Sequence, residues 1–450
     1  MTGRKEADST SRRPASSLHQ KVVSLRDRSP AQGMGRKRFT PGPVLRFLAI
    51  VGPGIIIANA GNDAGGVFTY SNIGAKYGYS LLWTFIPITI SLVVVQEMVG
   101  RLGCVTGKGL MDLIRERFGV RWTLLVSIVV IVANGGTLLA EFAGVAGALG
   151  LLGIPKTLAI LSAALLIAII VMRGNRQLVE RIFLALGLAF FSYFITAFLV
   201  PTQWKTVGHS FLVPSLSHPG VAGGAFLIDV IALIGTTITP YMQLYLQSSI
   251  VDKGSSRGDL PYVRADIISG AAFSNIVSVF IVITTAATLF NHGLAGIGIT
   301  STSSAARALT PLVGIHAQQL FAVGLLGASL LAAAVLPLST AFVVCEAFGA
   351  ERSVQRKFSE APLFFMLFLG LIIITAGVML VPHISITGVA IGTQTLDGVL
   401  LPVLLVFIFI LANDRALLGK YRNSLLLNII SFITIIALIG LDVVLLMNSL

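Results

Sequence analysis

The feature that most constrains this chain is a series of long apolar stretches that fills nearly all of it after residue 44. Eleven of these stretches can cross a bilayer as helices, since about 20 residues span the hydrocarbon layer. Only 11% of the 450 residues are charged, against about a quarter in a water-soluble domain. A soluble fold is thereby excluded, and the continuous apolar runs exclude the alternating pattern of a transmembrane β-barrel. We predict an all-α polytopic membrane protein with spans near 45–72, 78–101, 122–151, 157–172, 182–200, 223–250, 267–290, 316–349, 361–381, 384–412 and 424–447.

The basic residues predict how the chain is oriented in the membrane. With the N-terminus inside, 28 of the 32 Lys and Arg fall in the N-terminal segment and the inner loops, and four fall outside. Because positive charge stays in the cytoplasm, we expect a plasma (inner) membrane protein with a cytoplasmic N-terminus and an extracellular or periplasmic C-terminus. The net charge of +13 then reflects topology and contact with anionic lipid rather than nucleic-acid binding. Residues 1–43 lack an apolar run and are predicted to be a disordered, basic cytoplasmic tail.

Seven acidic residues remain within the predicted spans, whereas no Lys or Arg lies in the interior of a span. A carboxylate at the bilayer centre costs about 2.5–3.5 kcal/mol on the insertion scale. Without a basic partner in the spans, each acid is expected to be neutral, helix-capping, hydrated, close to the interface, or facing a cation. The seven are Asp63, Glu97, Glu141, Asp229, Glu346, Asp397 and Asp442.

Two of the predicted spans are interrupted in their middle. Glycines flank Asp63 in the first span, and each glycine disfavours a helix by about 1 kcal/mol relative to alanine. The sixth span contains the polar stretch 235–241, in which Pro240 frees backbone carbonyls one turn earlier. Interrupted helices five spans apart indicate inverted repeats with a binding site near the midplane. Free carbonyls beside a carboxylate are ligands for a hard divalent cation, so we predict a cation transporter or channel. Close packing of small residues around a neutral Asp63 remains the alternative.

The residues from Gly52 to Trp83 resemble the first span and following loop of the NRAMP divalent-metal transporters. This resemblance covers roughly residues 45–425 and implies a LeuT-like fold with 11 transmembrane helices. It implies two inverted five-helix repeats, 44–200 and 223–412, followed by one additional helix at 424–447. The matching residues are Gly52-Pro53-Gly54, Asp63 and Gly65 of the family's Asp-Pro-Gly-Asn motif, 74–79, 81–83, 101–103, 105–107, Ala140-Glu141, Tyr245-Leu246, Ser248-Ser249 and 413–415.

The chain also departs from the family pattern at residues close to the expected ion. Gly66 stands where the family has a metal-binding Asn, and Thr239-Pro240-Tyr241 stands where it has Met-Pro-His. A one-residue ambiguity would instead place Met242 at the His position, and Leu138 replaces an Asp of the proton path. Loss of the family's Met removes a soft thioether ligand, and loss of the Met and Asn side chains enlarges the cavity. Both changes favour a hard ion that keeps part of its hydration shell. The pattern is similar to the NRAMP-related magnesium transporters, a divergent branch that implies Mg²⁺ and Mn²⁺ transport without proton coupling.

We therefore expect a transporter, not an enzyme, that carries Mg²⁺ and also Mn²⁺ by alternating access without protons. No cofactor, nucleic acid or obligate protein partner is implied. Three candidate residues keep a second interpretation. Gln394 could form a helix–helix hydrogen bond instead of contacting the ion. Asp229 could be a protonated or water-solvated acid, and Tyr241 could simply line the cavity. The candidate ion-binding residues, partly carried over from the resemblance, are Asp63, Ala60, Thr236, Thr239, Gly66 and Gln394; the candidate pathway-lining residues are Glu141, Asp229 and Tyr241.

Three alternatives stay open at this point. A proton-coupled importer of Mn²⁺ or Fe²⁺ of the usual NRAMP type would need a proton relay through Glu141 and Asp229. A sodium-coupled symporter of organic solutes would use the same broken helices, although Asp63 would repel a substrate carboxylate. A membrane enzyme would need a deep Ser/His/Asp or paired-carboxylate arrangement, and the six histidines all lie in the tail, the outer loops or at span ends.

Overall fold

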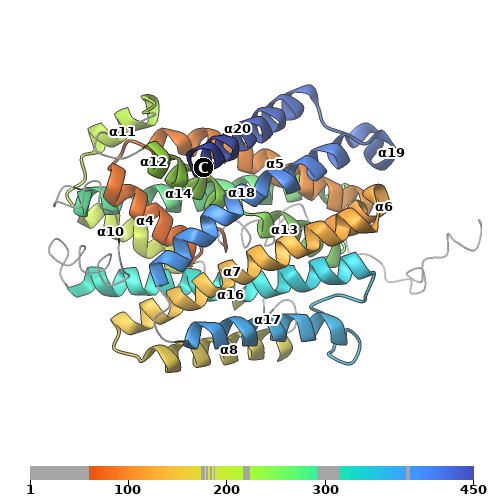
Figure 1. The fold of residues 1–450 in the computed structure, drawn as a ribbon, viewed down its shortest axis with the longest axis horizontal. Helices are drawn as coiled ribbons and strands as arrows, with labels where there is room; N and C mark the ends of the chain where they lie inside the picture. Colours follow the sequence, from red (N-terminus) through yellow and green to blue (C-terminus); the bar gives the residue numbers. More distant parts are fainter. Residues whose placement is uncertain are drawn as a thin grey trace, which may run out of the picture. The chain divides into compact units, whose positions relative to one another are not determined.

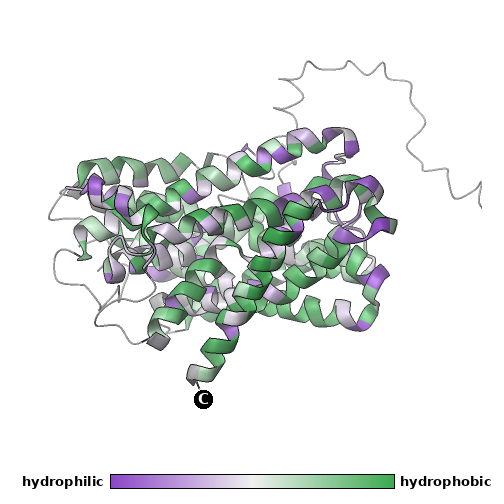
Figure 2. Ribbon diagram, turned by 90° about the horizontal axis from the view of Figure 1, so that it is seen from above, coloured by the Kyte–Doolittle hydropathy of each residue, from purple (hydrophilic) through white to green (hydrophobic). Residues whose placement is uncertain are grey.

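The computed structural model describes residues 60–173, 178, 181–182, 185–186, 188–215, 223–290, 299, 315–381 and 386–449. These residues all belong to one unit, 47–450, and every regular element among them is a helix. The predicted tail at 1–43 lies outside the described residues. Long helices arranged side by side, coloured largely hydrophobic along their lengths, confirm the predicted all-α membrane fold (Figures 1 and 2).

Among the described residues, nine segments are long and apolar enough to cross a membrane, and each coincides with a predicted span. The first and fifth predicted spans, 45–72 and 182–200, lie partly outside the described residues and contribute the shorter helices α4 (Ala64–Tyr77) and α10 (Phe191–Leu199). The nine segments contain α5 (Phe85–Thr106), α7 (Val120–Leu151), α8 (Lys156–Arg173), α12 (Gly223–Thr237) with α13 (Pro240–Asp252), α14 (Leu260–Thr288), α16 (Ile315–Phe348), α17 (Pro362–Leu380), α18 (Ile386–Asn413) and α20 (Leu425–Ser449). Shorter helices are α6 (Leu110–Phe118), α11 (Trp204–Leu212) and α19 (Arg415–Leu418).

Both predicted interruptions are present. Gly61–Asp63 is not helical, and α4 begins at Ala64 with Asp63 as its N-cap. An aspartate suits this position because its carboxylate accepts from backbone N–H groups that have no partner within the helix. In the sixth span, α12 ends at Thr237 and α13 begins with Pro240, which tolerates the first helical position because its missing N–H is not needed there. The break itself consists of Ile238 and Thr239.

Glycines bring the interrupted helices close to their neighbours. A Cβ on Gly74 of α4 would lie 2.1 Å from Thr285 Oγ1 and 2.5 Å from the carbonyl oxygen of Val282, both in α14. A Cβ on Gly235 of α12 would lie 2.3 Å from the carbonyl oxygen of Gln394 in α18. Small residues permit such close approach of backbones, which drives helix association where no hydrophobic effect operates. Each broken helix is therefore held against one unbroken helix. On the other side of the bundle, α7 and α16 pack along each other beside α8 and α17 (Figure 1).

Two of the three acids near span ends, Glu97 and Glu346, have basic partners, which the sequence analysis did not expect, and Glu346 also caps a helix as one of the expected roles. Glu97 lies 3.2 Å from Arg101 and 2.7 Å from Arg264. Glu346 lies 3.5 Å from Arg352 and accepts a hydrogen bond from the backbone N of Met111 at 3.1 Å, in the first turn of α6. The partners come from the last turns of α5 (Arg101), from α14 (Arg264) and from the loop after α16 (Arg352), which a count of charges within each span does not reveal.

Candidate ion-binding site

The two breaks bring three oxygen atoms together beside Gly66. A Cβ placed on Gly66 would lie 2.8 Å from Thr236 Oγ1, 3.1 Å from Asp63 Oδ1 and 3.1 Å from the carbonyl oxygen of Gly61. These are the three nearest heavy atoms, and all of them are oxygen. The absence of a side chain at Gly66 keeps open the space that they surround. The structure thus places Asp63, Thr236 and Gly66, all selected in the sequence analysis, around one point, although Thr236 contributes its hydroxyl there rather than the expected carbonyl, and the carbonyl is that of Gly61.

Asp63 is fully buried and its carboxylate is oriented by two neighbours. Its Oδ1 accepts a hydrogen bond of 2.5 Å from the backbone N of Gly66. The side-chain amide Nε2 of Gln394, in α18, lies 3.4 Å from Oδ1 and 3.5 Å from Oδ2. As the N-cap of α4, Asp63 places its carboxylate at the positive end of the helix dipole. Gln394 therefore contacts the carboxylate, as a tenth-span residue facing the site would.

Several buried oxygens around the breaks have no hydrogen-bond partner within the described residues. They include the hydroxyls of Thr236 and Thr239, the amide oxygen of Gln394 and Oε1 of Glu141. Buried polar atoms are normally paired, and each exception calls for a ligand, an ion or a water. Because oxygen lone pairs are what a hard cation coordinates, this set has the chemistry of a cation site.

Tyr241 connects the two breaks directly. Its hydroxyl donates a hydrogen bond of 2.7 Å to the carbonyl oxygen of Ala60, and Ser339 Oγ donates to the Tyr241 carbonyl oxygen at 3.2 Å. Ala60 was predicted as a carbonyl ligand. Since a carbonyl oxygen has two lone pairs, it keeps one acceptor position beside the bond to Tyr241.

Glu141 lies next to the first break. Its Oε2 accepts a hydrogen bond of 3.0 Å from the backbone N of Ala64, the residue that follows Asp63. Both acids are fully buried. A third buried acid, Asp397 of α18, accepts from Thr137 Oγ1 of α7 at 3.0 Å. Polar groups of α7 thus reach both α4 and α18.

Asp229 belongs to a separate cluster and has a basic partner. Its Oδ2 lies 2.7 Å from Lys76 Nζ and accepts a 2.7 Å hydrogen bond from the Tyr77 hydroxyl, and Asn72 Nδ2 lies 3.5 Å from Oδ1. The expectation of an unpaired acid is therefore wrong at this position. Lys76 was placed in an outer loop, but it lies in the last turn of α4, from which it reaches α12.

Asn62 positions the first break and was missed by the sequence analysis. Its Nδ2 donates to the carbonyl oxygen of Ser274 at 3.1 Å and to Ser274 Oγ at 3.0 Å, and Ser278 Oγ donates to Asn62 Oδ1 at 2.6 Å. The signal in the sequence is a pair of serines four residues apart in the seventh span, because that spacing puts both on one helix face.

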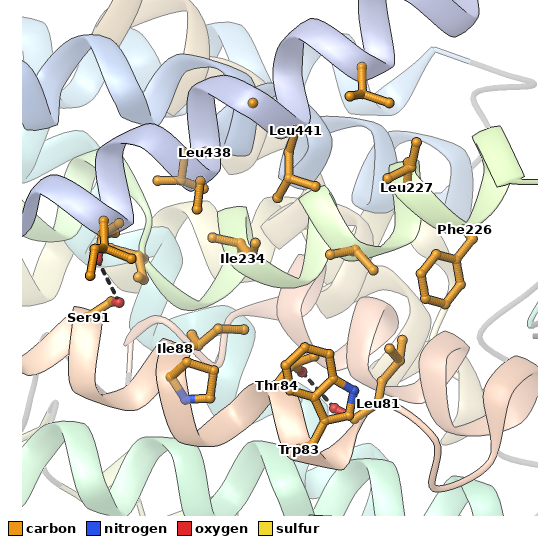
Figure 3. Close-up of a pocket in the computed structure, with 18 of the residues that line it drawn as sticks. Leu81, Trp83, Thr84, Ile88, Ser91, Phe226, Leu227, Ile234, Leu438 and Leu441 are labelled. Atoms are coloured by element: carbon orange, nitrogen blue, oxygen red, sulfur yellow. Dashed lines mark hydrogen bonds between the residues drawn. The ribbon is translucent and has the colours of Figure 1, made fainter. Parts of the chain in front are cut away.

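A cavity of about 800 Å³ between α5, α12 and α20 does not contain the candidate ligands. Its lining is largely apolar, and the polar atoms of Ser91 and Thr434 are bonded to each other at 2.8 Å (Figure 3). Ile238, from the second break, is part of its wall. Within the described ranges, no group of three or more His, Cys, Asp or Glu side chains is arranged to hold a metal ion. The oxygens around Gly66 come instead from one carboxylate, one hydroxyl and one backbone carbonyl.

Comparison with known proteins places these features in a family. Residues 54–448 match the model for natural resistance-associated macrophage protein-like (Nramp) sequences. The divalent metal cation transporter MntH of Verminephrobacter eiseniae is 26% identical over 421 residues, which is 90% of each chain. The divalent metal cation transporter MntH of Deinococcus radiodurans is 30% identical over 352 residues, covering 74% of this chain and 78% of its own.

Solved structures show the same fold. The Eremococcus coleocola manganese transporter, crystallised with an aromatic bis-isothiourea substituted compound, superposes with a TM-score of 0.72 at 20% identity, over 88% of this chain and 86% of its own. Mhp1, a nucleobase-cation-symport-1 family transporter, gives a TM-score of 0.52 at 14% identity, over 83% and 80%. The fold is therefore the predicted LeuT-like one, and with the match over residues 54–448 the chain belongs to the NRAMP family.

Proposed function

We propose that this protein carries divalent cations, Mg²⁺ and also Mn²⁺, across the membrane by alternating access and without moving protons. The ion would bind between the two breaks, each of which lies in the first helix of one proposed repeat, 44–200 or 223–412. In this proposal the N-terminus is cytoplasmic and the C-terminus lies on the extracellular or periplasmic side. The names of the curated relatives support transport of a divalent metal.

One observation supports a hard divalent ion over a soft transition metal as the substrate. The three heavy atoms closest to the open position at Gly66 are oxygens, from a carboxylate, a hydroxyl and a backbone carbonyl. Oxygen ligands suit Mg²⁺ and Mn²⁺, whereas soft sulfur ligands favour other transition metals. Mg²⁺ gives up its waters reluctantly and is usually held by one or two carboxylates together with several waters. A site with Asp63 and neutral oxygens fits that requirement.

The absence of proton coupling is supported by what surrounds Glu141. Leu138, three residues earlier on α7, is fully buried and apolar, so it provides no proton-carrying group. The membrane potential is a sufficient driving force, because a divalent ion gains about 4.6 kcal/mol per 100 mV, twice the value for a single charge. Uptake down this gradient requires no second ion.

Parallel measurements of metal and proton flux test this function. Purified protein would be placed in liposomes that contain a Mg²⁺ dye or a pH dye, with an inside-negative potential set by K⁺ and valinomycin. We expect Mg²⁺ influx that grows with the potential while the internal pH stays constant. Internal acidification in proportion to metal flux would contradict uncoupled transport, and absence of any metal flux would contradict the function altogether.

A proton-coupled importer of Mn²⁺ is the second candidate, and Glu141 favours it. This buried acid contacts the backbone of Ala64 beside Asp63, and one of its oxygens has no partner within the described residues. If Glu141 exchanges protons during transport, Glu141→Gln abolishes acidification and leaves a residual metal flux. If transport is uncoupled, the same variant changes only the affinity for the ion.

A further inference from the structure

Three buried hydroxyls without a protein partner line a small cavity away from the candidate ion site. They are Ser71 Oγ of α4, Tyr193 OH of α10 and Thr284 Oγ1 of α14, and none of them forms a hydrogen bond within the described residues. The three residues are at most 3% exposed. All three line the same cavity of about 10 Å³, which Phe321 of α16 closes on another side. Figure 1 shows α4, α10 and α14 close together in this part of the bundle.

We propose that this cavity binds one ordered water molecule, which bridges Ser71, Tyr193 and Thr284. A site for a water needs about 10–15 Å³ of accessible space and two to four polar partners, and this cavity offers both. Three hydroxyls supply donors and acceptors at once, which is the pattern that a water complements. The rest of the lining is neutral, with Thr196, Thr285, Ile281 and Phe321. No carboxylate of the described residues lines this cavity to balance the charge of a cation, so its neutral hydroxyls suit a water molecule.

The surrounding packing explains why the protein leaves this space. At Gly74, one turn along α4, a Cβ would lie 2.1 Å from Thr285 Oγ1, so the two helices already touch there. The Tyr193 ring meets Phe321 edge-on, with centroids 6.2 Å apart and planes at 82°. These contacts fix both the separation of α4 from α14 and the direction of the tyrosine. The three hydroxyls do not hydrogen-bond to one another, and in our proposal a water between them accepts and donates these bonds.

The bridge has a consequence for how α4 moves. The start of α4 is tied to α14 by Asn62, which bonds to Ser274 and Ser278. The water ties the middle of the same helix to α14 and, through Tyr193, to α10. A displacement of α4 away from α14 must therefore break the bridge or draw α10 with it. This inference holds whichever ion the protein carries.

Radiolytic footprinting of the full-length protein tests for the water directly. Brief X-ray exposure generates hydroxyl radicals from bound water, and mass spectrometry locates the oxidised side chains. We expect Phe321 to be labelled at the shortest exposures despite being buried. Phe364, which is fully buried and does not line this cavity, serves as the internal control. The inference is overturned if Phe321 is labelled no faster than Phe364.

A double-mutant comparison gives an independent test through thermal stability. Ser71→Ala and Tyr193→Phe each remove one partner of the water, and because the two side chains share no direct hydrogen bond, the water is their link. We expect the double variant to lower the melting temperature by clearly less than the sum of the two single shifts, and to lose the rapid labelling of Phe321. Additive shifts with unchanged labelling would overturn the proposal.

Discussion

The two helix breaks differ in chemistry and in how firmly they are held. The first break carries a carboxylate at Asp63 and is cross-linked to other helices by Asn62 and by Glu141. The second break carries the hydroxyl of Thr239, which has no partner within the described residues, and apolar Ile238, which lines the cavity beside α20. The first break thus presents a carboxylate that groups from other helices hold in place, and the second presents a buried hydroxyl without a partner among the described residues.

This difference suggests a division of labour between the breaks. A rigidly positioned carboxylate supplies most of the attraction for a cation, because a charged ligand contributes more than a neutral dipole. The neutral oxygens decide which cation is preferred, because they determine ligand softness and the space for water. Under the proposed function, we therefore expect affinity to depend on the first break and selectivity on the second. The predictions below test this division, beginning with the largest effect.

Replacing the carboxylate has the largest expected effect. Asp63→Ala removes the anionic ligand, so we expect metal uptake into proteoliposomes to fall to the level of protein-free vesicles. Asp442→Asn is the matched control, since this acid lies in α20 and none of the described contacts of the site involve it. Uptake by Asp63→Ala at the level of the unmodified protein would remove the first break from the site.

Filling the open position should weaken binding without removing a charge. In Gly66→Ala the added Cβ would lie 2.8 Å from Thr236 Oγ1 and 3.1 Å from Asp63 Oδ1, in the space where we propose that the ion binds. We expect KM for Mg²⁺ to rise by about tenfold, equivalent to about 1.4 kcal/mol. Gly370→Ala in α17 is the control, because a Cβ there meets nothing within 4 Å. An unchanged KM would place the ion elsewhere.

The anchoring of the first break is tested by stability. Asn62→Ala removes the partner of Ser274 Oγ, and leaving this buried hydroxyl unpaired costs about 1–3 kcal/mol, whereas Ser278 Oγ keeps its 3.1 Å bond to the Ser274 carbonyl oxygen. Ser339→Ala removes the single 3.2 Å bond to the Tyr241 carbonyl beside the second break and should cost about 0.5–1.5 kcal/mol. Thermal unfolding of both variants in detergent measures the difference. Equal shifts in melting temperature would contradict the contrast between the breaks.

The smallest effect concerns selectivity at the second break. Thr239→Met replaces a hydroxyl by a thioether, which is a softer ligand. We expect Cd²⁺ to compete several-fold more strongly with Mg²⁺ uptake, while KM for Mg²⁺ changes less than in Gly66→Ala. Thr239→Ser keeps the hydroxyl and should behave like the unmodified protein. If Cd²⁺ competition is the same in all three proteins, Thr239 does not contact the ion.

The sequence alone was sufficient to predict the membrane class, nine of the spans and both interruptions. It succeeded there because these features depend on local chemistry: runs of apolar residues, glycines around an aspartate, and a proline that cannot donate a backbone bond. The convergence of Asp63, Thr236 and Gly66 was also expected, through the resemblance to a family with this arrangement.

The partners of the polar groups were not predictable in the same way. Lys76 was assigned to a loop, yet it continues α4 and pairs with Asp229, 153 residues further along the chain. Asn62 and its two serines are 212 and 216 residues apart. Such pairs depend on which helices touch and at what rotation, and a single sequence records neither. Periodicity identifies the polar face of a helix but not the helix that it meets.

The carboxylate of Asp63, as the proposed ion ligand, has a consequence for the electrical behaviour of the transport cycle. In the proposed cycle, an ionised Asp63 gives the centre one net positive charge when a divalent ion is bound and one net negative charge after release. The loaded carrier moving inward and the empty carrier moving back outward each shift one charge in the same electrical direction. Voltage therefore accelerates both half-cycles, and transient currents are expected in the absence of metal, when only the empty carrier reorients.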